Sequence, residues 1–564
     1  MILENPQRIK DYSQYWDDKT IDDVFKNNVR NYPDFVALVD PVNRNTFTTG
    51  EQQRFTYAEM DRKVNQLATA FLEAGLAKDS IIGLFLPNIW ELVIGYLAIA
   101  RIGAIANPYP PSLREHEITK MGSFTGIRAM VTTSQFKDRD LADLVRSVKK
   151  DIPTFKYLFA NGIADSEDEF NLGSIFSSGI DRELLDVHLQ DNPVDPNDIF
   201  TICWTSGTTG MPKGVPRSHN LWTFTAHAST EGAGINHDYI FLCPFPIVNM
   251  GGIGGAMIPW LHAGCRFVLH QPFELPVFLK QIVMEKVTYS VAPPALLNIL
   301  LKNEAILANV DISSLKVLGS GSAPLSPWMI KGWYDKYGIQ VTNFFGSNEG
   351  MVLLGAPNSI PDLEKRATYF PAFGMVGSDY QHIKINQGME TKLVDIQTGK
   401  KITDYNTPGE LCVKGPCVFT GYYKAPETNA QVFDEEGYFK TGDVFELVED
   451  EGKRYYKFVE RCKDIIIRGG ANIAPATIEA LLVDMPKIAE CAIVGYPDED
   501  LGERLALFVV PKEGQEIALE EVVAHLRDKK IASYKLPEKL QTIDVLPRNP
   551  VGKILRRVLR EQVV

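Results

Sequence analysis

The sequence predicts an α/β protein with a large N-terminal domain of two α/β units and a β-rich part, followed by a small α+β C-terminal domain. Helical and strand patterns alternate over residues 55–160, and the alternation returns from 198 to about 345. This order is typical of parallel strands joined by crossover helices. Short strands separated by Gly, Asp and Glu predominate after about residue 380. A chain of 564 residues also exceeds what one hydrophobic core usually supports.

The individual elements follow from these patterns. In the first unit, about residues 20–200, we expect a helix at 56–76, a strand at 81–87, a helix from 90 and a strand at 129–134. In the second unit, about 201–380, short apolar strands are expected at FTICW, RFVLH, VTYSVAPP and LKVLGSG. The β-rich part spans about 381–460, with strands at GELCVKG, GYFKTGDVFELVED and RYYKFVERC. The small domain, 464–564, contains the predicted helix LEEVVAHLRDK.

Composition narrows the class of protein. The chain has 58 basic and 71 acidic residues and a net charge of −13, which argues against nucleic acid as the main partner. Seven cysteines form no C-x-x-C pair, so we expect reduced thiols in a cytoplasmic protein. The start of the chain lacks the apolar core of a signal peptide. Residues 240–261 are uncharged but contain three prolines and four glycines. We therefore expect a buried strand, a loop and the start of a helix that line a pocket, with membrane insertion as the alternative.

The stretch ICWTSGTTGMPKGVPRSHN, residues 202–220, has the composition of an anion-binding loop. Hydroxyl donors and glycines follow an apolar strand, and one lysine supplies a mobile positive charge. The residues concerned are Thr205, Ser206, Gly207, Thr208, Thr209, Gly210 and Lys213. It is not the triphosphatase loop G-x-x-x-x-G-K-[ST], because Pro212 disfavours a helix starting at the lysine. From this segment alone, a Ser/Thr/Gly-rich surface loop stays open as the alternative.

Several motifs in order along the chain resemble those of the adenylate-forming superfamily, which includes acyl-CoA synthetases, luciferases and peptide-synthetase adenylation domains. They are TSGTTGMPKG at 205–214, GSAP at 321–324, FFGSNE at 344–349, YFKTGD at 438–443, ERCKD at 460–464 and PRNPVGK at 547–553. Within the superfamily the chain is most similar to acyl-CoA synthetases that resemble 2,3-dihydroxybenzoate-AMP ligases. The resemblance implies an enzyme that activates a carboxylic acid with ATP, releases pyrophosphate and forms a thioester with coenzyme A.

The same resemblance implies roles for individual residues. The loop would hold the β- and γ-phosphates of ATP, Lys553 would bridge the carboxylate and the α-phosphate, and Glu349 would bind Mg²⁺. Asp443 and Arg461 would contact the ribose and nearby phosphate. The remaining implied nucleotide contacts are Gly321, Ser322, Ala323, Phe344, Phe345, Gly346, Ser347, Asn348 and Val459. Phe345 and Asn348 stand where the usual pattern has Tyr and Thr, and Asn348 still offers a donor and an acceptor.

A two-position cycle is a further implication of the resemblance. Lys463 would lie in a hinge at 461–464 between a large domain, 1–460, and a mobile domain, 464–564. Rotation of the small domain would remove Lys553 and bring Gly469 and Gly470 beside the phosphopantetheine arm of coenzyme A.

Residues expected around the acid are Asn249, Met250, Gly254, Gly321, Phe345 and Met351. Dihydroxybenzoate enzymes place an asparagine where this chain has Met250, whose thioether cannot replace an amide towards a ring hydroxyl. We therefore expect a medium aliphatic, alicyclic or simple aromatic acid, with Gly251, Gly252, Gly254 and Gly255 leaving room for it.

Three alternatives to this function stay open, and one of them is a luciferase-like oxygenase on the same fold. An aryl-acid AMP ligase would load a carrier protein in trans instead of coenzyme A. A non-catalytic adenylate-binding scaffold would use the same fold, although Lys213, Glu349, Asp443, Arg461 and Lys553 are all present. A homodimer is compatible with everything in the sequence.

Overall fold

The computed structural model describes residues 12–205, 212–321, 324–350, 352–375, 380, 383–468, 471–498, 500–529, 531–548 and 554–563. The chain forms two compact units, described here one at a time. The first comprises Met1–Glu390 with Lys414–Gly437, and the second Thr391–Val413 with Tyr438–Val564. The predicted boundary at 461–464 lies inside the second unit and stays a prediction.

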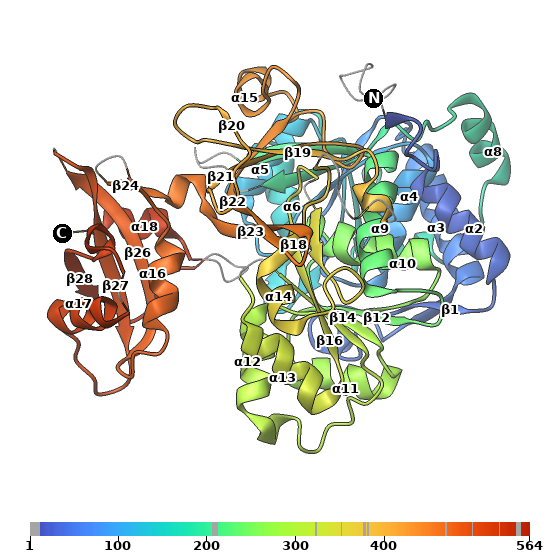
Figure 1. The fold of residues 1–564 in the computed structure, drawn as a ribbon. Helices are drawn as coiled ribbons and strands as arrows, with labels where there is room; N and C mark the ends of the chain where they lie inside the picture. The colour runs from blue at the N-terminus through green and yellow to red at the C-terminus, as the bar shows by residue number, and fades with distance from the viewer. Residues whose placement is uncertain are drawn as a thin grey trace. The chain divides into compact units, whose positions relative to one another are not determined.

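The first unit contains two largely parallel sheets (Figure 1). One sheet has the order β11 (Lys213–Ser218), β10 (Ile199–Thr205), β4 (Ile105–Pro108), β3 (Ile81–Leu84), β5 (Ala129–Thr133), β8 (Tyr157–Asn161) and β9 (Glu169–Asn171). The other has the order β17 (Val352–Gly355), β16 (Gln340–Gly346), β15 (Val317–Gly321), β14 (Tyr289–Val291), β12 (Ile240–Cys243), β13 (Arg266–Leu269), β1 (Val36–Val39) and β2 (Arg54–Thr56). Every strand that the sequence analysis predicted in the two α/β units, about residues 20–200 and 201–380, is confirmed.

The strands are distributed between the sheets differently from the predicted ranges. β1 and β2 come from the first predicted unit but belong to the second sheet, where β1 pairs in parallel with β13. β10 and β11 belong to the first sheet, where β10 pairs in parallel with β4. Periodicity identifies a strand but not its partner, because the pairing depends on residues far away in the sequence.

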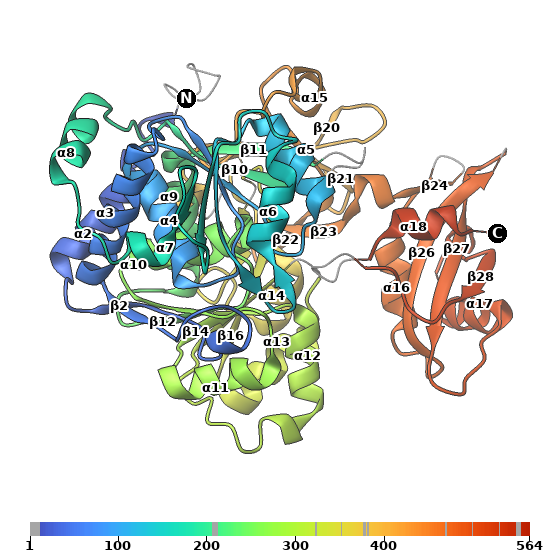
Figure 2. The same ribbon diagram turned by 180° about the vertical axis from the view of Figure 1, so that it is seen from behind.

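One hydrophobic core joins strands of both sheets to helices α3 (Tyr57–Glu73), α4 (Trp90–Arg101) and α9 (His219–Ala233). All residues of α4 are buried, which explains why its sequence is apolar on every side. Helices α5 (Glu115–Thr125) and α6 (Leu141–Lys149) pack against each other beside the first sheet, as Figure 2 shows. Thr56 begins α3 with a reciprocal capping box to Glu59.

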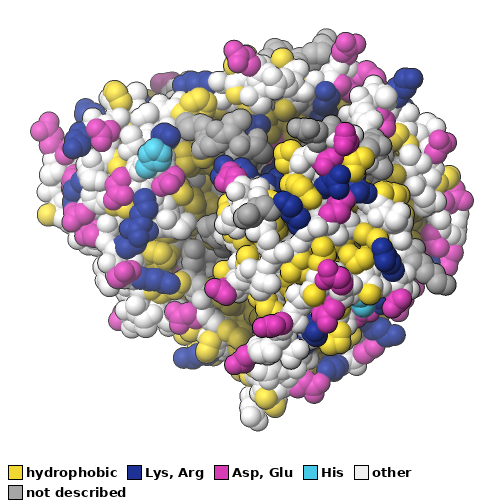
Figure 3. Space-filling model, turned by 90° about the vertical axis from the view of Figure 1, so that its left-hand side faces the viewer, with side chains coloured by type: hydrophobic (Ala, Val, Ile, Leu, Met, Phe, Trp, Pro, Cys, Tyr) yellow, Lys and Arg dark blue, Asp and Glu magenta, His cyan; other side chains and the backbone are white. Residues whose placement is uncertain are grey.

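The segment 240–261 is strand β12, a loop, the π-helix η2 (Met250–Met257) and the start of α10 (Ile258–Ala263), as expected. No helix within the described part of the chain is long and apolar enough to cross a membrane. Basic and acidic side chains are interspersed on the face of the molecule drawn in Figure 3.

The second unit contains the predicted β-rich part and the predicted small α+β part. The first forms antiparallel strands in the order β23 (Lys453–Arg461), β22 (Phe439–Asp450), β21 (Gly409–Lys414), β19 (Glu390–Val394) and β20 (Lys401–Ile402). The second is a sheet of β25 (Ala471–Ile473), β24 (Ile466–Arg468), β27 (Gly502–Pro511) and β26 (Ile488–Asp498), with β28 (Lys539–Thr542) beside β27. Helices α16 (Pro475–Leu482) and α17 (Leu519–Asp528) supply its core, and α17 confirms the predicted helix.

A buried ion cluster joins β1 to α4 in the first unit. Arg44 is 3% exposed, and its Nη1 donates to Asp40 Oδ2 at 2.7 Å and to Glu91 Oε2 at 2.9 Å. Burial raises the pKa of Asp40, and Arg44 opposes that rise. The guanidinium therefore supplies the positive charge that compensates the two buried carboxylates, Asp40 and Glu91.

Replacing Arg44 by Met should lower the free energy of unfolding of this unit by about 3–5 kcal/mol, because two buried carboxylates lose their cation. Urea denaturation measures the loss. The matched control Arg557→Met removes an exposed i,i+4 pair with Glu561 and should cost less than about 0.5 kcal/mol. The loss of stability in Arg44→Met should become smaller as the pH falls towards 5. A buried carboxyl with a raised pKa in the folded state destabilises the protein as the pH rises and the group ionises. Equal losses in both variants, independent of pH, would contradict the assignment.

Candidate active site

The predicted anion loop joins two antiparallel strands. β10 ends at Thr205, which pairs with Lys213 at the start of β11. Lys213 thus begins a strand and not a helix, as Pro212 indicates. Ser206, Gly207, Thr208, Thr209 and Gly210 lie outside the described residues. The structure therefore defines both ends of the loop and sets its lysine at the edge of the first sheet.

Lys213 and Glu349 contact different parts of the same side chain, that of Tyr422. The Lys213 Nζ lies 4.7 Å from the centroid of the Tyr422 ring, in the range of a cation–π contact. The Tyr422 hydroxyl donates to Glu349 Oε1 at 2.8 Å. Tyr422 thereby links the predicted phosphate-binding lysine to the predicted metal-binding carboxylate.

Glu349 lies in the loop after β16 and is 8% exposed. Its backbone carbonyl accepts from Phe419 N at 2.8 Å. The next residue, Gly350, has φ +104°, and a Cβ there would lie 1.9 Å from the Cys417 carbonyl oxygen. Only glycine fits both the conformation and the space, so this turn holds Glu349 against the Cys417–Tyr422 segment.

Asn348 bridges three parts of the first unit. Its Nδ2 donates to the Trp204 carbonyl at the end of β10 at 3.0 Å, and its Oδ1 accepts from Met250 N at 2.7 Å. Its backbone carbonyl accepts from Arg217 Nη1 at 3.1 Å. The sequence predicted a nucleotide contact for this side chain, and the structure gives both ends of the amide a protein partner.

Arg217 is fully buried on β11 behind these loops. Burial lowers its pKa to about 10, and the nearby charge of Glu349 acts in the opposite direction. The guanidinium lies 4.3 Å from the Trp222 ring centroid and donates to Leu221 O and to Thr225 Oγ1. Its hydrogen bond to the Asn348 carbonyl joins this buried cation to the loop that carries Glu349.

The predicted nucleotide contacts at Gly321 and Phe344 lie where β15 and β16 run side by side. Gly321 pairs with Phe344, and a Cβ on Gly321 would lie 2.3 Å from the Phe344 carbonyl oxygen. Phe345 packs edge-on against Phe370, with ring centroids 5.9 Å apart. Gly346 ends β16, and Ser347 follows it before Asn348. Ser322 and Ala323 lie outside the described residues.

The segment predicted to contact the acid forms η2. Asn249 caps this π-helix, because its Oδ1 accepts from Gly251 N at 3.0 Å and from Gly252 N at 3.4 Å. π-Helical turns are rare and occur frequently at functional sites. Met351 lies outside the described residues.

The expectation that Gly252 and Gly254 leave room is wrong. A Cβ on Gly254 would lie 2.4 Å from Met250 Sδ and 2.9 Å from the Trp222 ring. A Cβ on Gly252 would lie 2.1 Å from the Pro246 carbonyl oxygen. Both glycines therefore allow close packing of η2 on its neighbours instead of opening a space.

In the second unit, the structure brings Asp443 and Arg461 together as partners on β22 and β23. Arg461 Nε donates to Asp443 Oδ1 at 2.8 Å, and Asp443 is 5% exposed. Val459 lies two residues before Arg461 on β23 and packs beside a small core of Val444, Ile465 and Ala474.

Lys463 follows in the short turn Cys462–Asp464, where its carbonyl accepts from Arg560 at 2.8 Å. Gly469, Gly470 and Lys553 lie outside the described residues.

Tyr422 and Arg217 were not among the predicted site residues. The signal for Arg217 is a charged residue inside the apolar strand VPRS, which requires a buried partner. Tyr422 lies in GYYKAPE and gives no comparable signal, because its role depends on contact with Glu349, 73 residues earlier.

The chain is similar to known proteins over most of its length. The family model of the AMP-binding enzyme matches residues 25–423, and that of the AMP-binding enzyme C-terminal domain matches residues 477–553. The chain is 30% identical to the medium-chain fatty-acid–CoA ligase of Escherichia coli (strain K12), over 99% of this chain and 94% of that ligase. It is 28% identical to the 2,3-dihydroxybenzoate-AMP ligase of Bacillus subtilis (strain 168), over 97% of this chain and 94% of that ligase.

The fold has close counterparts among solved structures. ATP-bound MatB from Rhodopseudomonas palustris superposes with a TM-score of 0.77 at 23% identity, covering 96% of this chain and 99% of that chain. With two family models spanning most of its length and relatives aligned from end to end, the chain belongs to the AMP-binding enzyme family of the adenylate-forming superfamily and is a ligase of the AMP-forming class.

Proposed function

We propose that the protein is an acyl-CoA synthetase acting in two steps. A carboxylate oxygen of the acid attacks the α-phosphorus of ATP, an acyl–AMP anhydride forms, and pyrophosphate leaves. The thiol of coenzyme A then attacks the acyl carbonyl carbon, AMP leaves, and the thiol proton goes to solvent. The first step brings two anions together, so its rate depends on positioning and on compensating positive charge.

The observation that carries the proposal is the contact chain Lys213–Tyr422–Glu349. A lysine at the edge of the anion loop and a buried carboxylate are fixed on the same tyrosine by a cation–π contact and a 2.8 Å hydrogen bond. This arrangement supplies one positive group for phosphates and one hard oxygen ligand for a metal ion. Those are the groups that phosphoryl chemistry without a covalent intermediate requires.

Glu349 fits a magnesium ion. Among the described residues, Glu349 Oε1 accepts from Tyr422 and Oε2 has no hydrogen-bond donor. Mg²⁺ commonly binds one or two carboxylates and completes its shell with water and phosphate oxygens. Glu349 would hold the ion through Oε2, and the ion would supply compensating charge for the phosphates of ATP when bound.

The proposed acid is a medium aliphatic, alicyclic or simple aromatic carboxylic acid. Met250 begins η2, and its sulfur lies where a side chain at Gly254 would otherwise stand. A thioether and the Phe345 ring offer apolar contact and no strong donor for a ring hydroxyl. The relatives are named for acids of both aliphatic and aromatic kinds, so the identity of the acid rests on this local chemistry.

We further propose that the residue roles and the hinge implied by the resemblance apply here. Lys553 would act in adenylation, and Asp443 and Arg461 would contact the ribose. Lys463 would permit the small domain, 464–564, to rotate against 1–460 and present Gly469 and Gly470 for thioester formation. A carrier protein is the second candidate acceptor, favoured by the end-to-end similarity to an aryl-acid AMP ligase.

The testing experiment measures AMP release by the purified chain with ATP, Mg²⁺ and a panel of carboxylic acids, with and without coenzyme A. We expect AMP and an acyl-CoA thioester in equal amounts for a C6–C10, alicyclic or unsubstituted aromatic acid, and less product from dihydroxybenzoate. Lys553→Ala is the control and should abolish adenylation. It should also leave thioester formation from supplied acyl-AMP intact.

Two results would overturn this reading. Adenylate formation without any thioester to coenzyme A would favour the carrier-loading function. No pyrophosphate release with any acid would favour the non-catalytic scaffold.

Tyr422→Phe should lower the rate of adenylation by about 10–100-fold, the effect of losing a hydrogen bond to a charged group. The phenyl ring keeps the cation–π face for Lys213 and removes only the hydroxyl that orients Glu349. The Mg²⁺ concentration for half-maximal rate should rise in parallel. Steady-state kinetics against Mg²⁺ test this, with the exposed Tyr334→Phe as control. A wild-type Mg²⁺ response in Tyr422→Phe would show that the hydroxyl does not position the carboxylate.

A further inference from the structure

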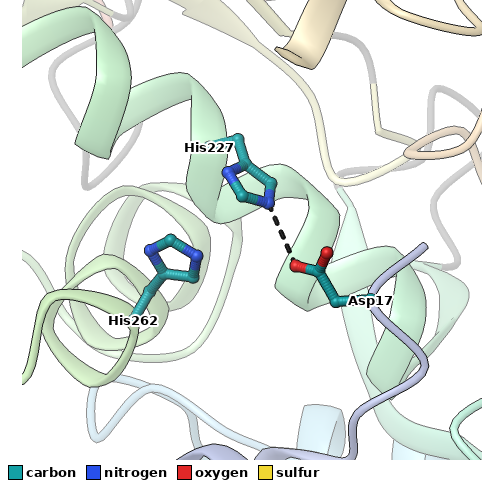
Figure 4. Close-up of side chains that lie close together, drawn as sticks. All are labelled: Asp17, His227 and His262. Atoms are coloured by element: carbon teal, nitrogen blue, oxygen red, sulfur yellow. Dashed lines mark hydrogen bonds and ion pairs between the residues drawn. The ribbon is translucent and has the colours of Figure 1, made fainter. Parts of the chain in front are cut away.

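Three metal-ligating side chains converge in the first unit, separate from Lys213 and Glu349 (Figure 4). Asp17 precedes α2 (Ile21–Asn31), His227 lies in the middle of α9, and His262 lies near the end of α10. One potential ligand atom from each lies within 4.8 Å of the other two. The function proposed above uses none of these residues.

His227 stands between two carboxylates. Its Nε2 lies 3.3 Å from Asp17 Oδ2, and its Nδ1 lies 3.4 Å from Glu231 Oε1. A neutral imidazole carries one N–H and donates to only one of these oxygens. The other ring nitrogen then presents a lone pair to a carboxylate oxygen. A cation at that position, either a proton or a metal ion, resolves the repulsion.

Lys384 holds the outer oxygens of the same two carboxylates. Its Nζ donates to Asp17 Oδ1 at 2.6 Å, and its backbone N–H donates to Glu231 Oε2 at 2.9 Å. Burial opposes ionisation, but Lys384 and His227 outweigh it and lower the pKa of Asp17 and of Glu231. Both carboxylates stay ionised, and their inner oxygens face the imidazole. With neutral histidines the group has a net charge of −1.

His262 completes the set. Its ring lies perpendicular to that of His227, with centroids 4.7 Å apart. Desolvation by burial, and after it the charge of the neighbouring His227, lowers the pKa of His262 to about 4. Asp17 and His262 are both exposed, so an ion can reach these side chains from solvent.

We propose that Asp17, His227 and His262 form a binding site for a divalent transition metal, with Zn²⁺ as the best match. Imidazole nitrogens with one carboxylate suit Zn²⁺, whereas Mg²⁺ prefers oxygen ligands alone. A tetrahedral ion with bonds of about 2.0–2.1 Å separates its ligands by roughly 3.3 Å. The Asp17–His227 contact has that length, and the ligand atoms of all three residues lie within 4.8 Å of one another.

Glu231 would then accept a hydrogen bond from the His227 ring nitrogen that faces away from the metal ion. A carboxylate that accepts from the ring nitrogen opposite the metal fixes the tautomer and orientation of the ligand. Because the three ligands come from different segments, the ion joins the N-terminal segment to α9 and α10. Its expected effect is therefore structural stabilisation of the first unit.

The test uses the full-length protein after removal of metals with a chelator, followed by dialysis against Zn²⁺ and metal analysis. We expect about one Zn²⁺ per chain and an increase in melting temperature on adding Zn²⁺. Co²⁺ in place of Zn²⁺ should give the visible absorption of a tetrahedral nitrogen–oxygen site. The double variant Asp17→Asn/His262→Gln, both at exposed positions, should lose all three signals, and Glu231→Gln should weaken binding by about 10–100-fold.

The matched control is His525→Gln, since His525 is paired with Asp484 at 3.1 Å and no second histidine completes a set within the described residues. This variant should bind Zn²⁺ as the wild type does. Failure of the wild type to bind Zn²⁺ would overturn the proposal. Equal Zn²⁺ binding by the double variant would also overturn it, because the metal would then occupy other ligands such as the free thiols.

Discussion

The two side-chain hydrogen bonds of Asn348 are the constraint on which the geometry of the site depends. One planar amide spans the end of β10, through Trp204 O, and the first turn of η2, through Met250 N. The distance between these two segments is therefore fixed by the dimensions of one side chain. Glu349 is the next residue along the chain, so the hydrogen bonds of the Asn348 amide also position the backbone that carries the Glu349 carboxylate. The predicted anion loop, the segment predicted to contact the acid and the proposed metal ligand are coupled through this residue.

Buried charge and close packing hold this junction in place. Arg217 is buried behind it, where removing a guanidinium from water is costly unless its donors are used. Its bonds to Asn348 O, Leu221 O and Thr225 Oγ1 and its contact with Trp222 offset part of that cost, while its Nε has no hydrogen-bond partner among the described residues. Gly350 adds a steric constraint, since any side chain would meet Cys417 O. These contacts restrict the conformation of the loop after β16.

The sequence predicted the secondary structure of both units well, because apolar periodicity and turn residues are local properties. Pro212 correctly excluded a helix after the anion loop, and 240–261 was correctly assigned to strand, loop and helix start. The errors concern long-range packing. Gly254 was expected to leave space, but Met250 and Trp222 fill it. The nucleotide contact that the resemblance implies for Asn348 stays a prediction, and the sequence did not indicate its amide partners, which lie 98 and 144 residues away. No local pattern encodes such contacts.

Helix α9 connects the two places in the first unit where a cation would bind. Its N-terminus follows Arg217 and Ser218 on β11, and His227 lies two turns further along. The ligands at the two places differ in kind: a lone carboxylate oxygen at Glu349, and two imidazoles with a carboxylate at His227. Hard oxygen ligands select Mg²⁺ and nitrogen-rich sets select Zn²⁺. Because Glu349 and the His227 group offer different donor types, the proposed Mg²⁺ that arrives with ATP and the proposed Zn²⁺ that joins the N-terminal segment to α9 and α10 would not compete for ligands.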